Sequence, residues 1–282
     1  MTEELKFVSE RGSIAFSSSS KYVFTSIENL NGAETTRQEN TYVDADGAEY
    51  SDIFYQPETV SVKGFIRAAN RAELITLRAK LFQHMNGKDS GILYYSVSGK
   101  RYFTEAQTVK PIVGERMQNI LSFTVYFERF NVLWKKDKLF KYDIYTRKNT
   151  LKTTFTLPCA FSTRTMEKTV INNGDVPAEC VIKIKGLKYA QSESGKGISI
   201  LNVATGEGIY LDCDADTDEI ITIDTAKASV VSSKSGNIMN HLFSKSVFGK
   251  IICGKNAIKV TNENPSNDII VTVEYYNTVL GV

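Results

Sequence analysis

One short stretch of the sequence, DCDADTDE, carries carboxylates at alternate positions. They are Asp212, Asp214, Asp216 and Asp218. This spacing begins an EF-hand calcium loop, which also requires a glycine at its sixth position and a bidentate glutamate at its twelfth. Thr217 and Ile223 stand at those two positions. We therefore expect a solvated β-turn here and no metal site.

The other side chains that could do chemistry are dispersed along the chain. The two histidines, His84 and His241, have no serine, cysteine or paired carboxylate placed against them in a recognisable motif. The cysteines lie too far apart in sequence for a CxxC pair that would bind zinc or carry out redox chemistry. They are Cys159, Cys180, Cys213 and Cys253. We expect buried reduced thiols, no cofactor and no enzyme activity.

The composition is that of an ordinary globular protein. The 282 residues are 42% hydrophobic and 23% charged, enough for two domains that each bury a core. The beginning, MTEELKFVSE, is acidic where a secretory signal would be basic and then apolar. Since no apolar run approaches the roughly 18 residues of a membrane span, we expect no membrane association and folding in a reducing cytoplasm.

Charge is distributed unevenly although the net charge is only +2. Residues 1–60 carry 4 basic and 11 acidic side chains, or −7, whereas residues 61–150 carry 17 basic and 7 acidic, or +10. This pattern is consistent with an acidic segment that docks on a basic body, within a copy or between copies. The alternative is two solvated faces that never meet. The overall balance argues against a strongly cationic nucleic-acid-binding surface.

The first half predicts strands around one helix. Residues 59–66, TVSVKGFI, alternate as a strand with Gly64 as a candidate bulge, and ILYYSVSGKRYFTEA predicts two strands reversing at Ser98-Gly99. In the helix NRAELITLRAKLFQHMNG, Asn70 caps the start, with Glu73 three residues on, and Gly87 follows the end. Its apolar stripe consists of Leu74, Leu77, Leu81 and Met85.

The stretch ILSFTVYFERFNVLW, residues 120–134, alternates as a half-buried strand until Arg129 and then loses its period. Large apolar groups followed by the polar run KKDK predict a domain boundary near residue 135, anchored by Phe130 and the single tryptophan, Trp134. The alternative is that Trp134 fills a local gap in the first core. The expected domains are residues 1–135 and 136–282.

The second half predicts a further set of short strands. Seven stretches are rich in β-branched residues and separated by turn residues. They are AECVIKIKG, GISILNV, GEGIYLD, DEIITID, KASVVSS, NAIKVTN and DIIVTVEYYN. Such spacing is typical of a two-sheet sandwich of the jelly-roll or galectin kind.

The order of these segments resembles the distal tail proteins of long-tailed phages. The most specific similarities are NNGDVPAECVIKIKG, within residues 172–186, and TGEGIYLDCDADTDEIITIDT, residues 205–225. The family often has proline just before the aromatic residue that closes the first domain, whereas this sequence has Asn131-Val132-Leu133. The resemblance implies an α+β or β-sandwich ring domain followed by a galectin-like β-sandwich.

The resemblance also implies a structural virion protein of the tail tip or baseplate, synthesised in the host cytoplasm. Copies would form a homo-hexameric ring that joins the tail tube protein to the tail-tip hub. The tape measure protein and receptor-binding proteins would be further partners. DNA would pass through the ring without being bound specifically.

We expect the segment 31–57, named the arm below, to be an extended arm or long hairpin that reaches a neighbour. A DNA channel should avoid phosphate-binding cations, so acidic residues of the arm are candidates for the channel wall or an inter-protomer contact. They are Asp44, Asp46, Glu49 and Asp52. The alternative function is a cell-wall carbohydrate-binding module, for which the sequence beyond residue 150 offers no tryptophan platform and four tyrosines.

Overall fold

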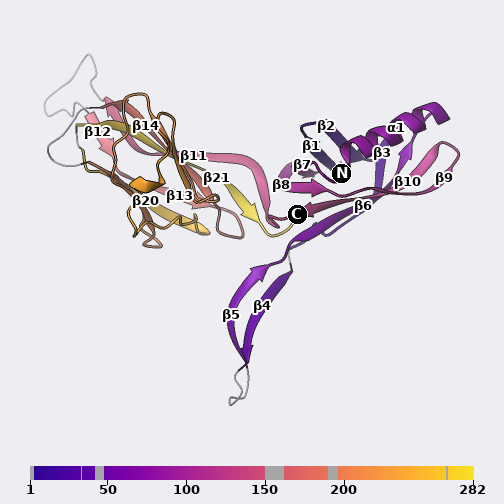
Figure 1. The fold of residues 1–282 in the computed structure, drawn as a ribbon, viewed down its shortest axis with the longest axis horizontal. Helices are drawn as coiled ribbons and strands as arrows, with labels where there is room; N and C mark the ends of the chain where they lie inside the picture. Colours follow the sequence, from indigo (N-terminus) through magenta and orange to yellow (C-terminus); the bar gives the residue numbers. More distant parts are fainter. Residues whose placement is uncertain (1–2, 33, 42–47, 150–161, 190–195, 265) are drawn as a thin grey trace. The chain divides into compact units, whose positions relative to one another are not determined.

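The computed structural model describes residues 3–32, 34–41, 48–149, 162–189, 196–264 and 266–282 (Figure 1). The chain folds into two compact units. Unit 1 comprises residues Met1–Asp137 and Thr278–Val282, and unit 2 comprises Lys138–Asn277. Strands dominate both units, which confirms a mostly β protein with one main helix. Each unit is described by itself below.

Unit 1 contains ten strands, the helix and the start of an eleventh strand. They are β1 (Glu3–Ser9), β2 (Gly12–Ser17), β3 (Tyr22–Glu28), β4 (Thr35–Thr41), β5 (Ala48–Tyr55), β6 (Glu58–Arg67), α1 (Arg71–His84), β7 (Ser90–Val97), β8 (Lys100–Thr108), β9 (Ile112–Met117), β10 (Ile120–Arg129) and β11 (Trp134–Asn149), whose later part lies in unit 2.

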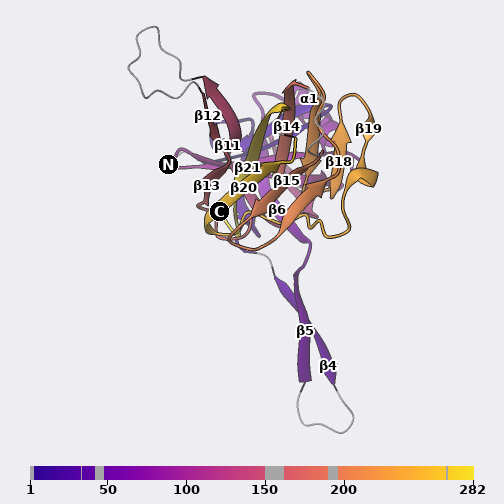
Figure 2. The ribbon, with the colours of Figure 1, turned by 90° about the vertical axis from the view of Figure 1, so that its left-hand side faces the viewer.

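The strands of unit 1 close on themselves as a barrel-like sheet. The order runs β8-β7-β1-β2-β3-β6-β10, and β10 pairs back with β8 where Phe127 faces Thr108. Neighbours are antiparallel except for β2 and β3, which meet in parallel where Phe16 faces Tyr22. Strand β9 extends from β10 at an edge, and β4 pairs with β5 as a separate hairpin (Figure 2).

The alternating apolar residues of the strands fill the first core. The buried side chains of β10 include those at 121, 123, 125 and 127, as the sequence period predicts. Aromatic rings from four strands, β1, β2, β3 and β10, meet there with centroids 5.3–6.5 Å apart. They belong to Phe7, Phe16, Tyr22, Phe123 and Phe127. Such tilted and edge-on contacts between rings add to the gain from burial.

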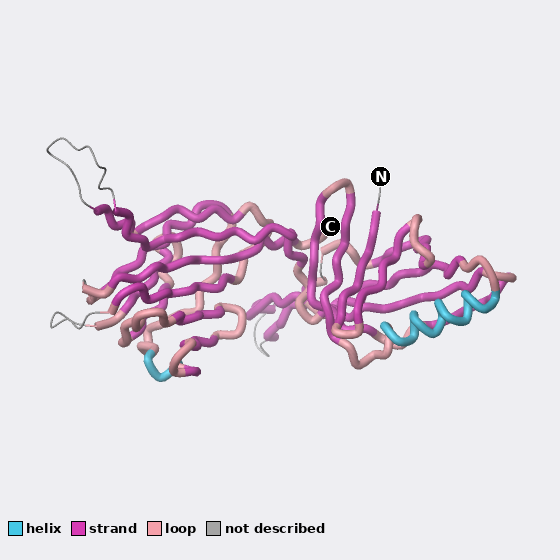
Figure 3. The backbone as a smooth tube through the Cα atoms, turned by 90° about the horizontal axis from the view of Figure 1, so that it is seen from above, coloured by secondary structure: helices cyan, strands magenta, loops and turns pink. Residues whose placement is uncertain are grey.

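Helix α1 lies against the strands of unit 1 (Figure 3). It contacts β2 and β6, and its leucine stripe enters the first core. The Asn70 side chain accepts a hydrogen bond from the Glu73 backbone N–H at 2.9 Å, which confirms the predicted cap. The Tyr22 hydroxyl donates to the Leu77 carbonyl at 2.9 Å and ties β3 to the helix. Burial raises the pKa of Tyr22 to about 12, so this hydroxyl remains a donor at neutral pH. The helix ends at His84, and Gly87 follows in the left-handed region.

Unit 2 has its core between two sheets. The larger sheet has the order β19-β18-β17-β14-β21-β11, with β12 on β11, and the smaller has the order β13-β20-β15-β16. The elements are β12 (Ser162–Thr165), β13 (Glu167–Asn172), β14 (Cys180–Lys188), β15 (Ile198–Asn202), β16 (Gly208–Leu211), β17 (Ile220–Asp224), β18 (Ser229–Ser232), β19 (Gly236–Asn237), the short 3-10 helix η1 (Met239–His241), β20 (Gly254–Asn262) and β21 (Asp268–Val279).

The last five residues belong to unit 1, which differs from the expected division at residue 135. Val279 is buried in the first core, and the Val282 N–H donates to the Leu30 carbonyl at 3.2 Å. Gly281 packs so closely on Gly32 that a β-carbon added to it would lie 3.0 Å from the Gly32 nitrogen. The chain therefore crosses between the units twice, along β11 and along β21.

Candidate functional site

The arm is a hairpin formed by β4 and β5. The two strands pair with each other, with a register shift between Gln38 and Glu39. Of the four acidic residues expected to line a channel or an interface, Asp44 and Asp46 lie outside the described residues. Glu49 and Asp52 lie on β5, and their role stays a prediction. The end of β5 leaves three large side chains exposed: Ile53 at 60%, Phe54 at 52% and Tyr55 at 44%.

Arg129 holds the root of the arm. Its side chain, at the end of β10, is fully buried. Its guanidinium donates to the Glu58 carboxylate at 2.5 Å, to the Asn29 carbonyl at 3.3 Å and to the Val132 carbonyl at 3.1 Å. Asn29 follows β3 and Glu58 begins β6, so the contacts join both ends of the segment that contains the arm to the end of β10.

The Arg129–Glu58 pair is electrostatically costly. Burial raises the pKa of Glu58, and the charge of Arg129 opposes that rise. Burial also lowers the pKa of Arg129. Both directions reflect the loss of water around two charges, which the ion pair offsets through its short contact and the added carbonyl hydrogen bonds. The alternation of β10 places position 129 on the buried face, but the charge of an arginine gave no reason to expect burial there.

The two residues expected to anchor the domain boundary have different environments. Trp134 is fully buried in the first core, with its ring 4.9 Å from the Arg129 guanidinium carbon and 6.4 Å from the Tyr95 ring. Phe130 is 68% exposed, so it does not anchor the boundary within one copy. The alternation of β10 continues through the buried Arg129 and turns Phe130 outward, beside a shallow groove along β7 and β8.

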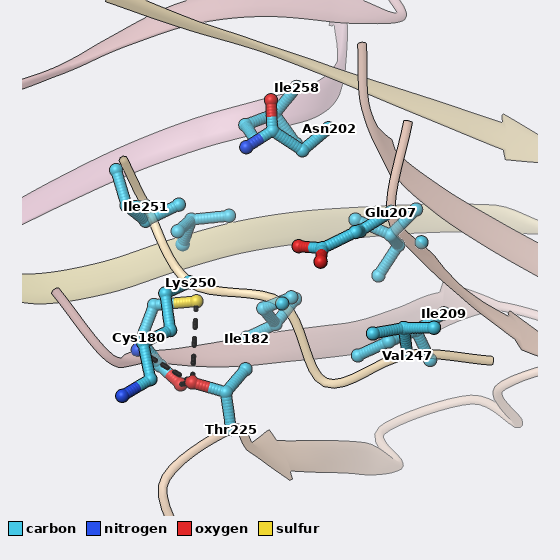
Figure 4. Close-up of a pocket in the computed structure, with 14 residues that line it drawn as sticks. Cys180, Ile182, Asn202, Glu207, Ile209, Thr225, Val247, Lys250, Ile251 and Ile258 are labelled. Carbon is cyan, nitrogen blue, oxygen red and sulfur yellow. Dashed lines mark hydrogen bonds between the residues drawn. The ribbon is translucent and has the colours of Figure 1, made fainter. Parts of the chain in front are cut away.

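Unit 2 contains a small, mostly apolar cavity between its sheets (Figure 4). Its volume is about 40 Å³, room for roughly one water molecule and too little for a sugar ring. The Cys180 thiol lies in its wall, 3.9 Å from the Thr225 hydroxyl. Burial raises the pKa of Cys180 to about 11, which makes it a poor nucleophile at neutral pH. The Glu207 carboxylate also borders the cavity.

The thiols differ in exposure, although the sequence suggested that all would be buried. Cys180 is buried, Cys213 is partly buried and Cys253 is exposed, and all three are free. Cys159 lies outside the described residues. Cys253 is exposed because it lies in the turn that leads into β20, ahead of the strand's buried positions.

The aspartates of the calcium-like stretch are directed to different partners. Asp212 contacts the His241 ring at 2.6 Å, and Asp214 accepts hydrogen bonds from the Gly197 backbone and the Asn264 amide. In the described residues, no group of three or more side chains is arranged to hold a metal ion. None of the helices described is long and apolar enough to cross a membrane.

Tyr210, one of the four tyrosines considered for a sugar platform, is partly buried and covered on one face. The Lys245 ammonium lies 4.1 Å from the centre of its ring. The nearby Phe243 ring is 51% exposed and lies 5.9 Å from the same ammonium. Together these groups form a cationic and aromatic surface beside β16. This arrangement gives no specific support to a carbohydrate platform.

Two protein-family models match the chain. The phage tail protein RIFT-related domain matches residues 10–129, and the C-terminal domain of the siphovirus-type tail component matches residues 173–278. No match was found among curated proteins. The first matched range covers most of the barrel of unit 1, and the second covers most of the sandwich of unit 2.

Solved structures of phage proteins share the fold. The chain is similar to the Dit (gp 19.1) protein of phage SPP1, described as a paradigm of the hub adsorption apparatus in phages infecting Gram-positive hosts. The TM-score is 0.70 at 10% identity, over 99% of both chains. A chain of the phage P2 baseplate in its activated conformation with Ca gives a TM-score of 0.55 at 10% identity, over the full length of both chains. The chain belongs to the distal tail proteins of siphoviruses and is a structural component of the phage tail.

Proposed function

We propose that copies of this chain form a hexameric ring through unit 1, and that the ring joins the tail tube to the tail-tip hub. The observation that carries the proposal is that separate tail-protein models match both units. Unit 1 also exposes apolar side chains that are costly to leave in water. The largest exposed fractions are those of Met117, Phe130, Ile75 and Ile53. Such side chains are available for burial against another copy or another tail protein.

A closed ring requires two different surfaces of each copy to meet head to tail. The segment that includes the arm is strongly acidic, and the sequence that follows it is basic, so the two provide complementary surfaces. In this proposal the arm reaches the neighbouring copy or the tube. Deleting residues 38–52 should then abolish or weaken the ring while leaving the barrel folded.

The channel of the ring would let DNA pass without retaining it. Each phosphate neutralised by lysine or arginine adds a salt-dependent gain in affinity, so a basic channel would hold DNA back. We propose that acidic residues of the arm, Glu49 and Asp52 among them, face the channel or the neighbouring copy. Purified rings should therefore not retain double-stranded DNA at physiological salt, and tight retention would contradict this assignment.

Unit 2 would hold adsorption proteins on the outside of the ring. Three apolar side chains of the segment after β19 support a docking role, with Met239 37%, Phe243 51% and Val247 47% exposed. Because Lys245 covers one face of the Tyr210 ring, we favour a docking role for unit 2 over sugar binding. A glycan array tests the order of these two roles, because reproducible sugar binding that Tyr210→Ala abolishes would reverse it.

Size-exclusion chromatography with light scattering tests the ring directly. We expect a particle with the mass of about six chains of 31.5 kDa, with an annular shape in negative-stain micrographs. Isolated tail tips should contain the same annulus. A chain that stays monomeric in solution and forms no annulus in the virion would refute the proposal.

A further inference from the structure

One lateral face of helix α1 carries a stripe of basic and apolar residues that unit 1 leaves largely exposed, with only Phe82 partly buried. Arg71, Ile75, Arg78 and Phe82 follow each other at spacings of four, three and four, which places them in one line along the helix. Ile75 is 61% exposed, and the Arg78 guanidinium carbon lies 5.6 Å from the centre of the Phe82 ring. These four residues are named the α1 stripe below.

The arginines of the α1 stripe have no carboxylate partner among the residues that the structure describes. Among the described residues, neither Arg71 nor Arg78 forms an ion pair, whereas Arg11 pairs with Asp89 at 2.6 Å. Guanidinium groups are weakly hydrated and bind carboxylates in a fixed planar geometry, so they are well suited to an interface. An exposed isoleucine between two such groups favours a partner that presents carboxylates together with large apolar side chains.

The arm has that chemistry. Residues 31–57 contain six acidic side chains and one basic side chain. The end of β5 adds the exposed Ile53, Phe54 and Tyr55. Ile53, Phe54, Tyr55 and Ile75 are all exposed within one copy, so these side chains of the arm and the stripe do not cover one another there.

We propose that the α1 stripe of one copy is the docking face for the arm of a second copy. The inference rests on the proposed ring and specifies one contact in it. The lengths are compatible. Eleven residues of helix advance about 16 Å, and a strand as long as β5 extends about 27 Å, so the hairpin spans the whole stripe. Because arm and stripe are different surfaces, the contact is head to tail and propagates from copy to copy.

Charge reversal on each side of the contact tests the inference. The double variant Arg71→Glu and Arg78→Glu places carboxylates opposite an acidic arm. The concentration at which rings form should therefore rise at least about tenfold. The arm variant Glu49→Arg and Asp52→Arg should weaken rings in the same way. Combining the four substitutions should restore ring formation, because opposite charges face each other again.

A matched control changes the net charge equally elsewhere. Lys188→Glu and Lys255→Glu alter two exposed lysines of unit 2 and should leave rings intact. Light scattering and negative-stain microscopy measure the rings, and circular dichroism melting confirms that each variant is folded.

The outcomes separate this contact from the ring itself. If the Arg71→Glu, Arg78→Glu variant is folded and forms rings at the same concentration as the wild type, the α1 stripe is not a docking face. If the stripe variant weakens rings but the four-fold combination does not restore them, the arm is not the occupant. A wild-type chain that forms no rings would overturn the proposed function and this inference together.

Discussion

Replacing Arg129 with methionine removes a fully buried guanidinium and leaves its partners behind. Glu58 would keep a carboxylate that is only 16% exposed, and the carbonyls of Asn29 and Val132 would each lose a donor. Removing one partner of a buried ion pair typically costs about 3–5 kcal/mol. We expect about 3 kcal/mol, the lower end of this range, because Glu58 retains some contact with water.

Trp134 makes the assay specific to unit 1. It is the single tryptophan of the chain and lies buried in the first core, so its fluorescence follows the unfolding of that unit in urea. The double variant Arg129→Met with Glu58→Leu removes both charges and should recover at least about 1 kcal/mol of the loss. Arg101→Met is the matched control, because its pair with Asp137 is at the surface and should contribute under about 1 kcal/mol.

The pH dependence of the Arg129→Met variant provides a second check. Burial raises the pKa of Glu58, and removing Arg129 removes the charge that opposes this rise. A carboxyl group with a raised folded-state pKa destabilises the protein above that pKa and ceases to do so as the pH falls below its unfolded value near 4.5. The deficit should therefore shrink on acidification. A loss below about 1 kcal/mol at neutral pH, or a double variant no more stable than the single one, would refute the reasoning.

Three further predictions concern thiols, a glycine and an acidic residue. Alkylation followed by peptide mapping should modify the exposed Cys253 well before Cys180 and Cys213, since burial raises the pKa of both to about 11; equal rates would contradict this. Gly64→Ala should lower the free energy of unfolding of unit 1 in urea by more than about 1 kcal/mol, because a β-carbon would lie 2.2 Å from a backbone oxygen of β3. An unchanged urea midpoint would show that β3 and β6 can move apart at this point without loss of stability. Burial alone would raise the pKa of Glu274, but contacts with two lysines outweigh burial and lower that pKa. The stabilisation of the fold by the Glu274 carboxylate should therefore be present at neutral pH and lost as the pH falls below about 4.5. Circular dichroism melts of wild type and Glu274→Gln should converge in acid, and a constant difference would argue against this.

Local sequence patterns were sufficient to predict the strands, helix start and turn that are specified by neighbouring residues. The alternation in β10, the Asn70 cap and the turn at Ser98-Gly99 all follow from nearest-neighbour chemistry, and both turn residues have positive φ, as a two-residue hairpin turn requires. The family could also be identified from the order of these segments. Each of these features depends on residues close together in the sequence.

The remaining features depend on contacts between distant segments. Closure of the barrel joins Phe127 to Thr108, and the local periods of β8 and β10 do not specify that pairing. The burial of Arg129 depends on Glu58, 71 positions away. The outward position of Phe130 continues the alternation of β10, which the cluster of apolar letters after Arg129 concealed. The α1 stripe is visible as spacing, but its lack of ion pairs requires the folded structure.

The return of residues 278–282 to unit 1 has a consequence for biosynthesis. During translation the barrel is begun first, yet the segment that packs against Leu30 and Gly32 leaves the ribosome only after all of unit 2. The sandwich is in effect an insertion in the barrel, so it can fold while the barrel still lacks its last piece. Copies interrupted during synthesis would carry an unfinished barrel surface at Leu30 and Gly32.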